Sequence, residues 1–317
     1  MKKVIYFLFL GLFSCAENAI NDQVVDDVKN VGVSIVEMEG LVDSRMEVTD
    51  RMDYLWEFTD TIGIFPSKGG QVEFPITEES ISEDRKYAYF SGGGWALKGG
   101  YNYSAYYPYN FYNRDATAVP FSYAGQVQDG SDNRNHLSDY SLLIASPTPV
   151  NKGQIEFNLK NVGCLLKLTL TLPAVKTYTS LDLYADSEII PIKKTYNILT
   201  ADVAEKVVTT TNRLSFGLNN ITATAAGQNV VLWVAFPTMN QPSKTLKAVL
   251  KDSQGYVYVG DVTKAKADAN TGSFDFYLEL GRNKGYGVKA SPVLTDGFTG
   301  GIEDWVNDGQ DYGGVAK

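Results

Sequence analysis

The sequence LKLTLTL at residues 166–172 decides the fold class. Its four leucines alternate with Lys167, Thr169 and Thr171, so a β-strand formed here has one apolar face and one polar face. Pro173 follows directly and is expected to end the strand, because proline cannot donate a hydrogen bond to a sheet. The pattern predicts an antiparallel sheet that is buried on one side only.

Strand patterns of this kind recur on both sides of that segment. Alternating or β-rich apolar runs, bounded by Gly, Pro, Asn or Asp, occur at residues 31–35, 61–65, 230–236, 246–250, 256–259 and 274–280. Helical periodicity extends over no more than about two turns anywhere in the chain. The sequence therefore predicts an all-β protein built of antiparallel sheets, and not the alternating strands and helices of a parallel α/β enzyme.

The length of the chain indicates two domains. Its 317 residues are about twice the usual size of one domain. We expect two tandem antiparallel β-sandwiches, at residues 31–162 and 163–290, with the boundary near the interruption Asn161-Val162-Gly163. Residues 291–317 are rich in Gly and Asp and are predicted to form a tail.

The first fourteen residues have the features of a bacterial lipoprotein signal peptide. Lys2 and Lys3 precede an apolar run at residues 4–10 that is too short to span a bilayer. The sequence Leu12-Phe13-Ser14-Cys15 then resembles a lipobox, which predicts that the signal is removed and Cys15 is acylated, for example with palmitate. Residues 15–30 would form a lipidated tether at the outer membrane. The alternative is an ordinary secretory signal with an incidental cysteine.

Composition argues against several functions. The chain has 28 Lys and Arg against 37 Asp and Glu, a net charge of −9, which opposes nucleic-acid binding. Its single histidine, His136, and its two cysteines exclude a zinc cage and every mechanism that needs two histidines. Cys164 lies in an apolar strand and is expected in the core. Adjacent carboxylates such as Glu83-Asp84 have no feature of an opposed catalytic pair. We expect no enzyme activity, no metal and no cofactor.

The segment at residues 101–112 has seven aromatic residues in twelve and allows two interpretations. In the first, a strand packs its alternate aromatic side chains in the core, and the tyrosines near Pro108 stay exposed. In the second, the aromatic rings form a surface on which sugars stack. The candidate ligand surface then consists of Tyr106, Tyr107, Tyr109 and Tyr112.

Six segments in order carry a family resemblance: Ser14-Cys15, Ser44-Arg45 followed by Trp56–Phe65, Ala105–Tyr109, Asp139–Ala145, Phe157–Leu168 and Trp233–Pro237. Each segment alone is no more than a strand with a turn. Together they cover nearly the whole chain, and they resemble the fimbrillin family, the lipoprotein-derived type V pilus subunits of Bacteroides-like anaerobic Gram-negative bacteria.

The resemblance implies two transthyretin-like β-sandwiches, no catalysis and a role in surface fibres. In that family an arginine-specific protease removes the first strand, and a strand of a neighbouring subunit fills the groove that remains. The matching processing site is Arg45, with Arg51 as the alternative, and the displaced strand would contain Val31, Val33 and Ile35. The other interpretation of Arg45 is a solvated loop residue that is never cut.

The function that follows from the resemblance is a structural or adhesive subunit of a cell-surface fimbria (pilus). Its partners would be other fimbrial subunits, outer-membrane lipid through Cys15, and host or bacterial surface glycans. Residues 291–317 alternate poorly because Gly300-Gly301 and Gly313-Gly314 interrupt them, which argues against polymerisation through this tail and leaves a tip or accessory subunit, or a surface lipoprotein that never polymerises, as alternatives. The alternative function is a lipid-anchored surface carbohydrate-binding module that does not polymerise.

Overall fold

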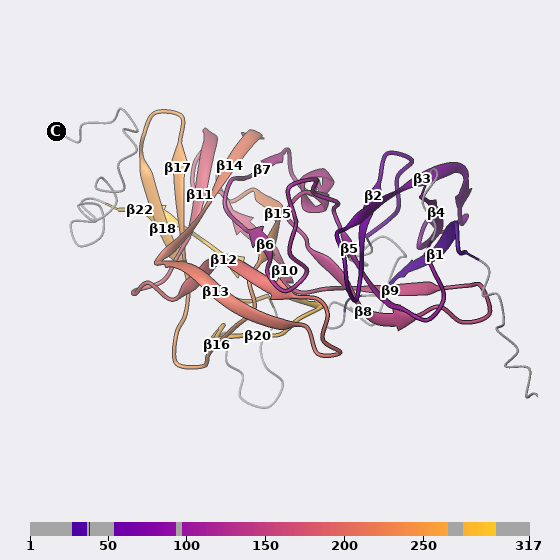
Figure 1. The fold of residues 1–317 in the computed structure, drawn as a ribbon. Helices are drawn as coiled ribbons and strands as arrows, with labels where there is room; N and C mark the ends of the chain where they lie inside the picture. The colour runs from indigo at the N-terminus through magenta and orange to yellow at the C-terminus, as the bar shows by residue number, and fades with distance from the viewer. Residues whose placement is uncertain (1–26, 37, 39–53, 93–96, 266–274, 296–317) are drawn as a thin grey trace, which may run out of the picture.

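The structure is almost entirely β-sheet, which confirms the all-β prediction. It is a computed structural model that describes residues 27–36, 38, 54–92, 97–265 and 275–295. Within these ranges the only helix is the single 3-10 turn η1 (Asn135–Ser138). The strands gather into two units that lie side by side (Figure 1). The described part of the chain contains no helix with the length and apolar character of a membrane span.

Seven strands of the first unit form a closed barrel in the order β1-β4-β3-β2-β5-β8-β9. Their bounds are β1 Asn30–Ile35, β2 Thr61–Pro66, β3 Val72–Ile81, β4 Tyr87–Ser91, β5 Asn102–Tyr107, β8 Leu143–Pro149 and β9 Glu156–Asn161.

The sequence predicts a two-sheet sandwich for this half, whereas one sheet here closes on itself. Closure occurs because β1 pairs antiparallel with β4 on one side and parallel with β9 on the other. Register shifts in the β3–β4 and β5–β8 pairs bend the sheet further. The transthyretin-like arrangement that the resemblance implies stays a prediction.

The second unit contains a four-stranded sheet, β15-β10-β21-β19, and a six-stranded sheet, β22-β18-β17-β11-β14-β7. Two small sheets, β13-β12-β6 and β16-β20, complete it. The bounds of these strands are β6 Val119–Ser122, β7 Gln126–Asp129, β10 Cys164–Thr171, β11 Thr177–Tyr184, β12 Ile190–Asn197, β13 Ala204–Thr211, β14 Arg213–Thr222, β15 Asn229–Phe236, β16 Met239–Gln241, β17 Lys247–Asp252, β18 Val257–Asp261, β19 Thr263–Lys264, β20 Leu278–Leu280, β21 Lys284–Ala290 and β22 Val293–Leu294.

The LKLTLTL segment lies at the centre of this second unit. All of it but Leu172 belongs to β10, which pairs antiparallel with β15 and parallel with β21. All four of its leucines are buried in the large core, while Lys167 and Thr169 stay partly exposed. The same core contains Leu181 and Leu250 from the six-stranded sheet, so the two large sheets enclose it together.

The segment between β5 and β8 leaves the barrel and joins the second unit. Its strand β6 pairs with β12, and β7 pairs parallel with β14. Tyr123 and Leu137 from this segment lie in the large core of the second unit. The limits 31–162 and 163–290 stay a prediction, but strand pairing shows that part of the first segment is built into the second unit.

A third apolar cluster joins the two units. Phe65, Tyr106 and Ile144 reach into it from the barrel strands, and Val119 and Tyr196 reach into it from β6 and β12. All five side chains are almost completely buried. The outer wall of the barrel therefore rests on the small three-stranded sheet.

Candidate functional site: the first strand and the junction of the units

The first strand, β1, completes the barrel with both of its edges. Val31 and Val33 lie opposite Phe90 and Ala88 of β4. On the other side, Val33 and Ile35 lie beside Phe157 and Leu159 of β9. Backbone bonds continue past the strand, because the Val36 amide donates to the carbonyl of Leu159 at 2.9 Å. Removing β1 would therefore leave the backbone groups of two strands without partners.

The side chains of β1 fill the core of the barrel. Val31 and Val33 are fully buried there, as their alternation predicts, and Ile35 is half-buried against the same core. Gly32 lies so close to the end of the Tyr87 ring that an added Cβ would overlap it. A replacement strand would need a small residue at this position and apolar residues on either side.

Trp56 lies in the barrel core, against the strand that pairs with β1. Its fully buried ring packs edge-on against Phe90 at 4.9 Å and against Tyr107 at 5.4 Å. The Trp56 backbone is fixed by Arg85, whose Nε donates to the Trp56 carbonyl at 2.9 Å. Phe90 also faces Val31, so the tryptophan supports the layer on which β1 rests.

The predicted processing sites lie in the connection between β1 and this tryptophan. Arg45 and Arg51 fall in residues 39–53, which lie outside the described residues, as do Cys15 and the tail beyond residue 295. Their roles stay predictions. The connectivity nevertheless has a clear consequence: one cut anywhere in residues 39–53 separates β1 from every later strand of the barrel.

A polar junction lies where the chain enters the second unit. The Tyr54 hydroxyl donates to Ser141 Oγ at 2.6 Å and accepts from Asn161 Nδ2 at 2.5 Å. The Asn161 Oδ1 atom in turn accepts from the Gly163 amide at 2.7 Å. Burial raises the pKa of the Tyr54 hydroxyl, so it stays protonated and keeps its donor role. Tyr54 packs against both large cores, which ties the segment that precedes β2 to the second unit.

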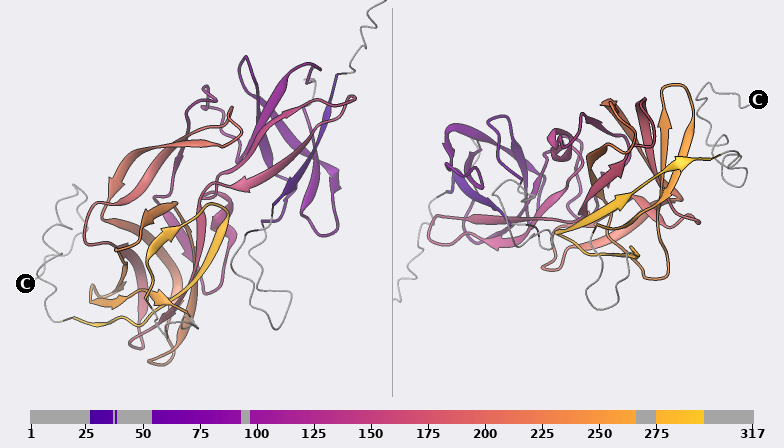
Figure 2. Two further views of the ribbon diagram at one scale, coloured as in Figure 1. Left: turned by 90° about the horizontal axis from the view of Figure 1, so that it is seen from below. Right: turned by 180° about the vertical axis from the view of Figure 1, so that it is seen from behind.

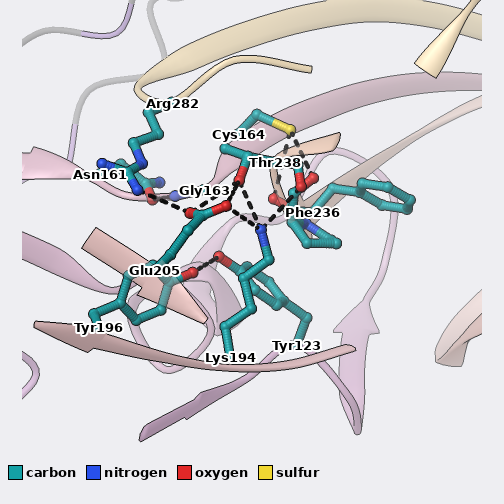
Figure 3. Close-up of polar contacts among 11 residues, drawn as sticks. Tyr123, Asn161, Gly163, Cys164, Lys194, Tyr196, Glu205, Phe236, Thr238 and Arg282 are labelled. Carbon is teal, nitrogen blue, oxygen red and sulfur yellow. Dashed lines mark hydrogen bonds and ion pairs between the residues drawn. The ribbon is translucent and has the colours of Figure 1, made fainter. Parts of the chain in front are cut away.

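A buried lysine lies close to this junction (Figure 3). The Lys194 side chain is only 1% exposed, and its Nζ donates to Glu205 Oε1 at 2.9 Å. It also donates to Oγ1 of Thr238 at 2.8 Å and to the carbonyl of the same residue at 2.9 Å. Arg282 reaches the second oxygen of Glu205 at 3.0 Å. The cluster ties β12 and β13 to the segments that follow β15 and β20.

The charges around Glu205 favour the ionised form of its carboxylate. Burial on its own raises the pKa of Glu205, but the hydrogen bonds and charges of Lys194 and Arg282 outweigh burial and hold the pKa below 4.5, its ordinary value. All donors of Lys194 have partners, which is the condition under which a buried ammonium is tolerated. The arrangement is a structural clamp, and nothing in it is placed to attack a substrate.

Sequence reasoning missed this clamp. Lys194 occupies a buried position of a strand, and a lysine there gives no local sign of its partner. Glu205 follows eleven residues later, and Thr238 and Arg282 are further away. Only the packing of the four segments brings them together.

Cys164 lies in the core, as expected. It is fully buried, with its Sγ 3.4 Å from the Phe236 carbonyl. Burial raises the pKa of its thiol far above the ordinary value, and the positive charge of Lys194 offsets only part of this. A thiol of this kind is protonated and unreactive at neutral pH.

We expect Cys164 to resist thiol reagents in the folded protein. A chain without the first fifteen residues, and so without Cys15, should react slowly with a colorimetric disulfide reagent until denaturant is added. One equivalent should then react at once, because unfolding removes the burial. Rapid reaction of the native chain would show that the thiol is accessible.

The aromatic segment is mostly core. Tyr106 and Tyr107 are buried, and their hydroxyls donate to Gln71 Oε1 at 2.6 Å and to Asp60 Oδ1 at 2.8 Å. Tyr109 is only partly exposed. Of the four tyrosines of the candidate ligand surface, Tyr112 alone is largely exposed, at 84%. The structure therefore does not bring the four rings together on one surface.

One exposed aromatic pair remains in the loop after β5. Phe111 and Tyr112 meet edge-on at 5.7 Å, and the guanidinium of Arg114 lies 4.4 Å from the centre of the Phe111 ring. This pair can supply one stacking face for a ligand, and not the row that a glycan-binding surface would use. A role in glycan binding stays a prediction.

No metal-binding group is found in the described ranges. None of their His, Cys, Asp and Glu side chains gather in threes or more at a spacing that holds an ion. The ring of His136 binds the Trp233 carbonyl through Nε2 at 2.9 Å, and burial lowers the pKa of this histidine. It therefore serves as a neutral structural side chain.

Comparison with known proteins finds a likeness at the level of the fold. No protein-family model matches the sequence, and no curated protein is similar to it. Among solved structures, a candidate cell adhesion protein of Bacteroides ovatus is similar, with a TM-score of 0.53 and 14% identity, over 86% of this chain and 95% of that one.

Two further solved structures have lower scores. A candidate cell adhesion protein of Bacteroides uniformis has a TM-score of 0.48 and 14% identity, over 84% of this chain and 98% of that chain. The tip fimbrial protein Mfa3 of Porphyromonas gingivalis, truncated at its C-terminus, has a TM-score of 0.41 and 12% identity. The match covers 86% of this chain and 100% of that chain. The likeness to the Bacteroides ovatus protein is one of fold, and the resemblance to the fimbrillin family is consistent with it.

Proposed function

We propose that this protein is a structural or adhesive subunit of a surface fimbria, and that it assembles by strand replacement without catalysis. One observation carries the proposal: β1 closes the barrel, yet a single cut in residues 39–53 would break its covalent link to every later strand. Two arginines, Arg45 and Arg51, lie in that connection. The fold shared with a candidate cell adhesion protein supports the same function.

Strand replacement has a physical driving force here. After β1 leaves, the facing edges of β4 and β9 expose unpaired backbone groups, and Phe90 and Phe157 are uncovered between them. Such an edge is a template for an extended segment of another chain, whose alternate side chains enter the apolar gap. A neighbouring fimbrial subunit is the partner that would supply this segment.

The proposal that the protein is exported rests on the sequence alone. The lipobox-like Leu12-Phe13-Ser14-Cys15 supports a lipoprotein that is carried to the outer membrane, anchored through Cys15. An intact β1 would keep the precursor closed during this passage, so that fibres form only at the cell surface. The poor alternation of residues 291–317 argues against this tail as the donor strand.

The proposal is tested by limited proteolysis. The chain without its first fifteen residues should be treated with an arginine-specific protease and followed by light scattering. Oligomers are expected in the cut sample and are expected to be missing from a variant with Arg45→Ala and Arg51→Ala. Sequencing of the new N-terminus separates the sites, since Met46 follows one arginine and Met52 the other. A clean cut that leaves a stable monomer would remove the polymerising role.

A further inference from the structure

The outward face of β1 contains a glycine that is buried. Val31 and Val33 face the barrel core, so Asn30, Gly32 and Ser34 face outward. Asn30 is exposed and Ser34 is half-buried, but Gly32 between them is buried. Figure 2 shows β1, in indigo, on the barrel side of the molecule, away from the orange and yellow strands of the second unit. Something other than the second unit therefore covers Gly32.

The cover is the side chain of Tyr87 on β4. Gly32 pairs with Tyr89, and Tyr87 lies two residues further along β4, a diagonal position from which an aromatic ring can reach across. A Cβ added to Gly32 would overlap the Tyr87 hydroxyl and lie 3.0 Å from Cζ of the same ring. On the β9 side it would lie 3.3 Å from Cγ of Glu156. Position 32 of the strand thus has space for glycine alone.

The Tyr87 ring is held in this position. It meets the ring of Tyr89 edge-on, with the ring centres 5.2 Å apart. At its base, the Tyr87 carbonyl accepts from the Ser82 amide at 2.8 Å, and the Tyr87 amide donates to Ser82 Oγ at 3.0 Å. A tyrosine has only two side-chain torsions, so the ring cannot turn away from Gly32 without losing its contact with Tyr89. A side chain at position 32 is therefore costly.

The glycine also fixes the register of the strand. A shift by one residue would turn the apolar side chains outward, and a shift by two would place Asn30 or Ser34 beneath Tyr87. In the observed register Ser34 lies beside Asn158 of β9, and its Oγ donates to Asn158 Oδ1 at 2.5 Å. One alignment thus satisfies the core, the tyrosine and this hydrogen bond together.

We propose that Tyr87 selects the strand that replaces β1, and that it admits a segment in which glycine lies between two apolar residues and a hydroxyl residue follows. This inference rests on the proposed function, strand replacement at the barrel. The template is β1 itself, whose residues 31–34 have the sequence Val-Gly-Val-Ser. Other strands would meet the Tyr87 ring with a side chain and would be rejected.

The selection has a consequence for the partner. Six glycines occur in residues 291–317, and none of them has an apolar residue on both sides. This stretch of a second copy therefore does not fit beneath Tyr87. The donor is an extended segment of a subunit with a different sequence.

Melting temperatures of the chain without its first fifteen residues test the role of Tyr87. Gly32→Ala should lower the barrel transition by about 4 °C or more in calorimetry, because the added methyl overlaps the ring. In a chain with Tyr87→Ala, the same substitution should instead raise the transition, since alanine loses less conformational freedom on folding than glycine. Asn30→Ala is the matched control on the same face of β1, and it should have little effect because Asn30 is exposed.

The reversal of sign is the decisive result. If Gly32→Ala lowers the transition equally with and without the Tyr87 ring, or lowers it in neither chain, the ring is not what excludes a side chain at position 32. Either outcome would overturn the proposal.

A labelled peptide of residues 27–38 tests selection between molecules. It is added in excess to the chain treated with the arginine-specific protease, and bound label is measured after gel filtration. Gly32→Ala in the peptide should weaken uptake about tenfold or more, and should not weaken uptake by the Tyr87→Ala chain. A peptide of residues 291–306 should not be taken up. Uptake of all these peptides without discrimination would remove the selection alone, whereas uptake of none would remove strand replacement and the selection with it.

Discussion

A chain that begins at Met46 is expected to lose most of the stability of its barrel while the second unit stays folded. It lacks β1, so the buried Val31 and Val33 are missing, together with backbone pairing to β4 and β9. Burying each of these side chains stabilises by roughly 1.5 to 3 kcal/mol. Their combined loss is large against the few kcal/mol that hold a domain of this size together.

Scanning calorimetry measures this effect. The transition of the barrel should move to a much lower temperature, and the transition of the second unit should change little, since its core draws on other strands. A chain that begins at residue 27 is the control, because it lacks the tether but retains β1. Unchanged transitions in the shorter chain would mean that β1 contributes little to the barrel.

Lys194→Met is expected to cost about 3 kcal/mol of unfolding free energy, measured with denaturant. Removing one partner from a buried ion pair leaves the other charge without compensation. Here Arg282 would be the only cation left beside Glu205, and the carbonyl of Thr238 would lose the lysine as its donor. The neighbouring Lys193 is exposed, so Lys193→Met should change the free energy by no more than about 0.5 kcal/mol. Equal effects of the two substitutions would contradict the clamp.

The clamp also predicts that the stability of the folded chain depends on pH. The pKa of Glu205 in the folded chain lies below its ordinary value of 4.5. The stabilisation from its ion pairs is therefore fully present above pH 4.5 and is lost as the pH falls through the lowered pKa. Glu205→Gln should remove this part of the acid dependence, which thermal melts between neutral and acidic pH would show.

Local patterns were sufficient to predict several of the strands. The alternating leucines of LKLTLTL and the valines of β1 are buried, because a period of two places them on one face wherever that face packs. The aromatic segment shows the limit of such reasoning. Every residue of β5 from Tyr103 to Tyr107 is buried, since one face fills the barrel and the other meets the second unit.

Pairing between strands that lie far apart in the sequence could not be predicted from local patterns. Closure of the barrel depends on β1 meeting β9, more than a hundred residues later, and no local pattern encodes that contact. The same holds for the glutamines that cover β15: Gln126 and Gln128 are ordinary polar residues of a strand until the chain folds back onto the second unit. The candidate site was predicted in part, as a first strand with apolar alternation, but its two-sided pairing was not.

The central claim is that β1 is a strand which another strand can replace. A fluorescent peptide spanning residues 27–38, added to the chain that begins at Met46, tests it most directly by fluorescence anisotropy. The account predicts saturable binding that an unlabelled copy displaces and that Val33→Asp in the peptide abolishes, because a carboxylate cannot enter the apolar gap. The contradicting result is no binding by a chain whose second unit is folded, or equal binding of the Val33→Asp peptide.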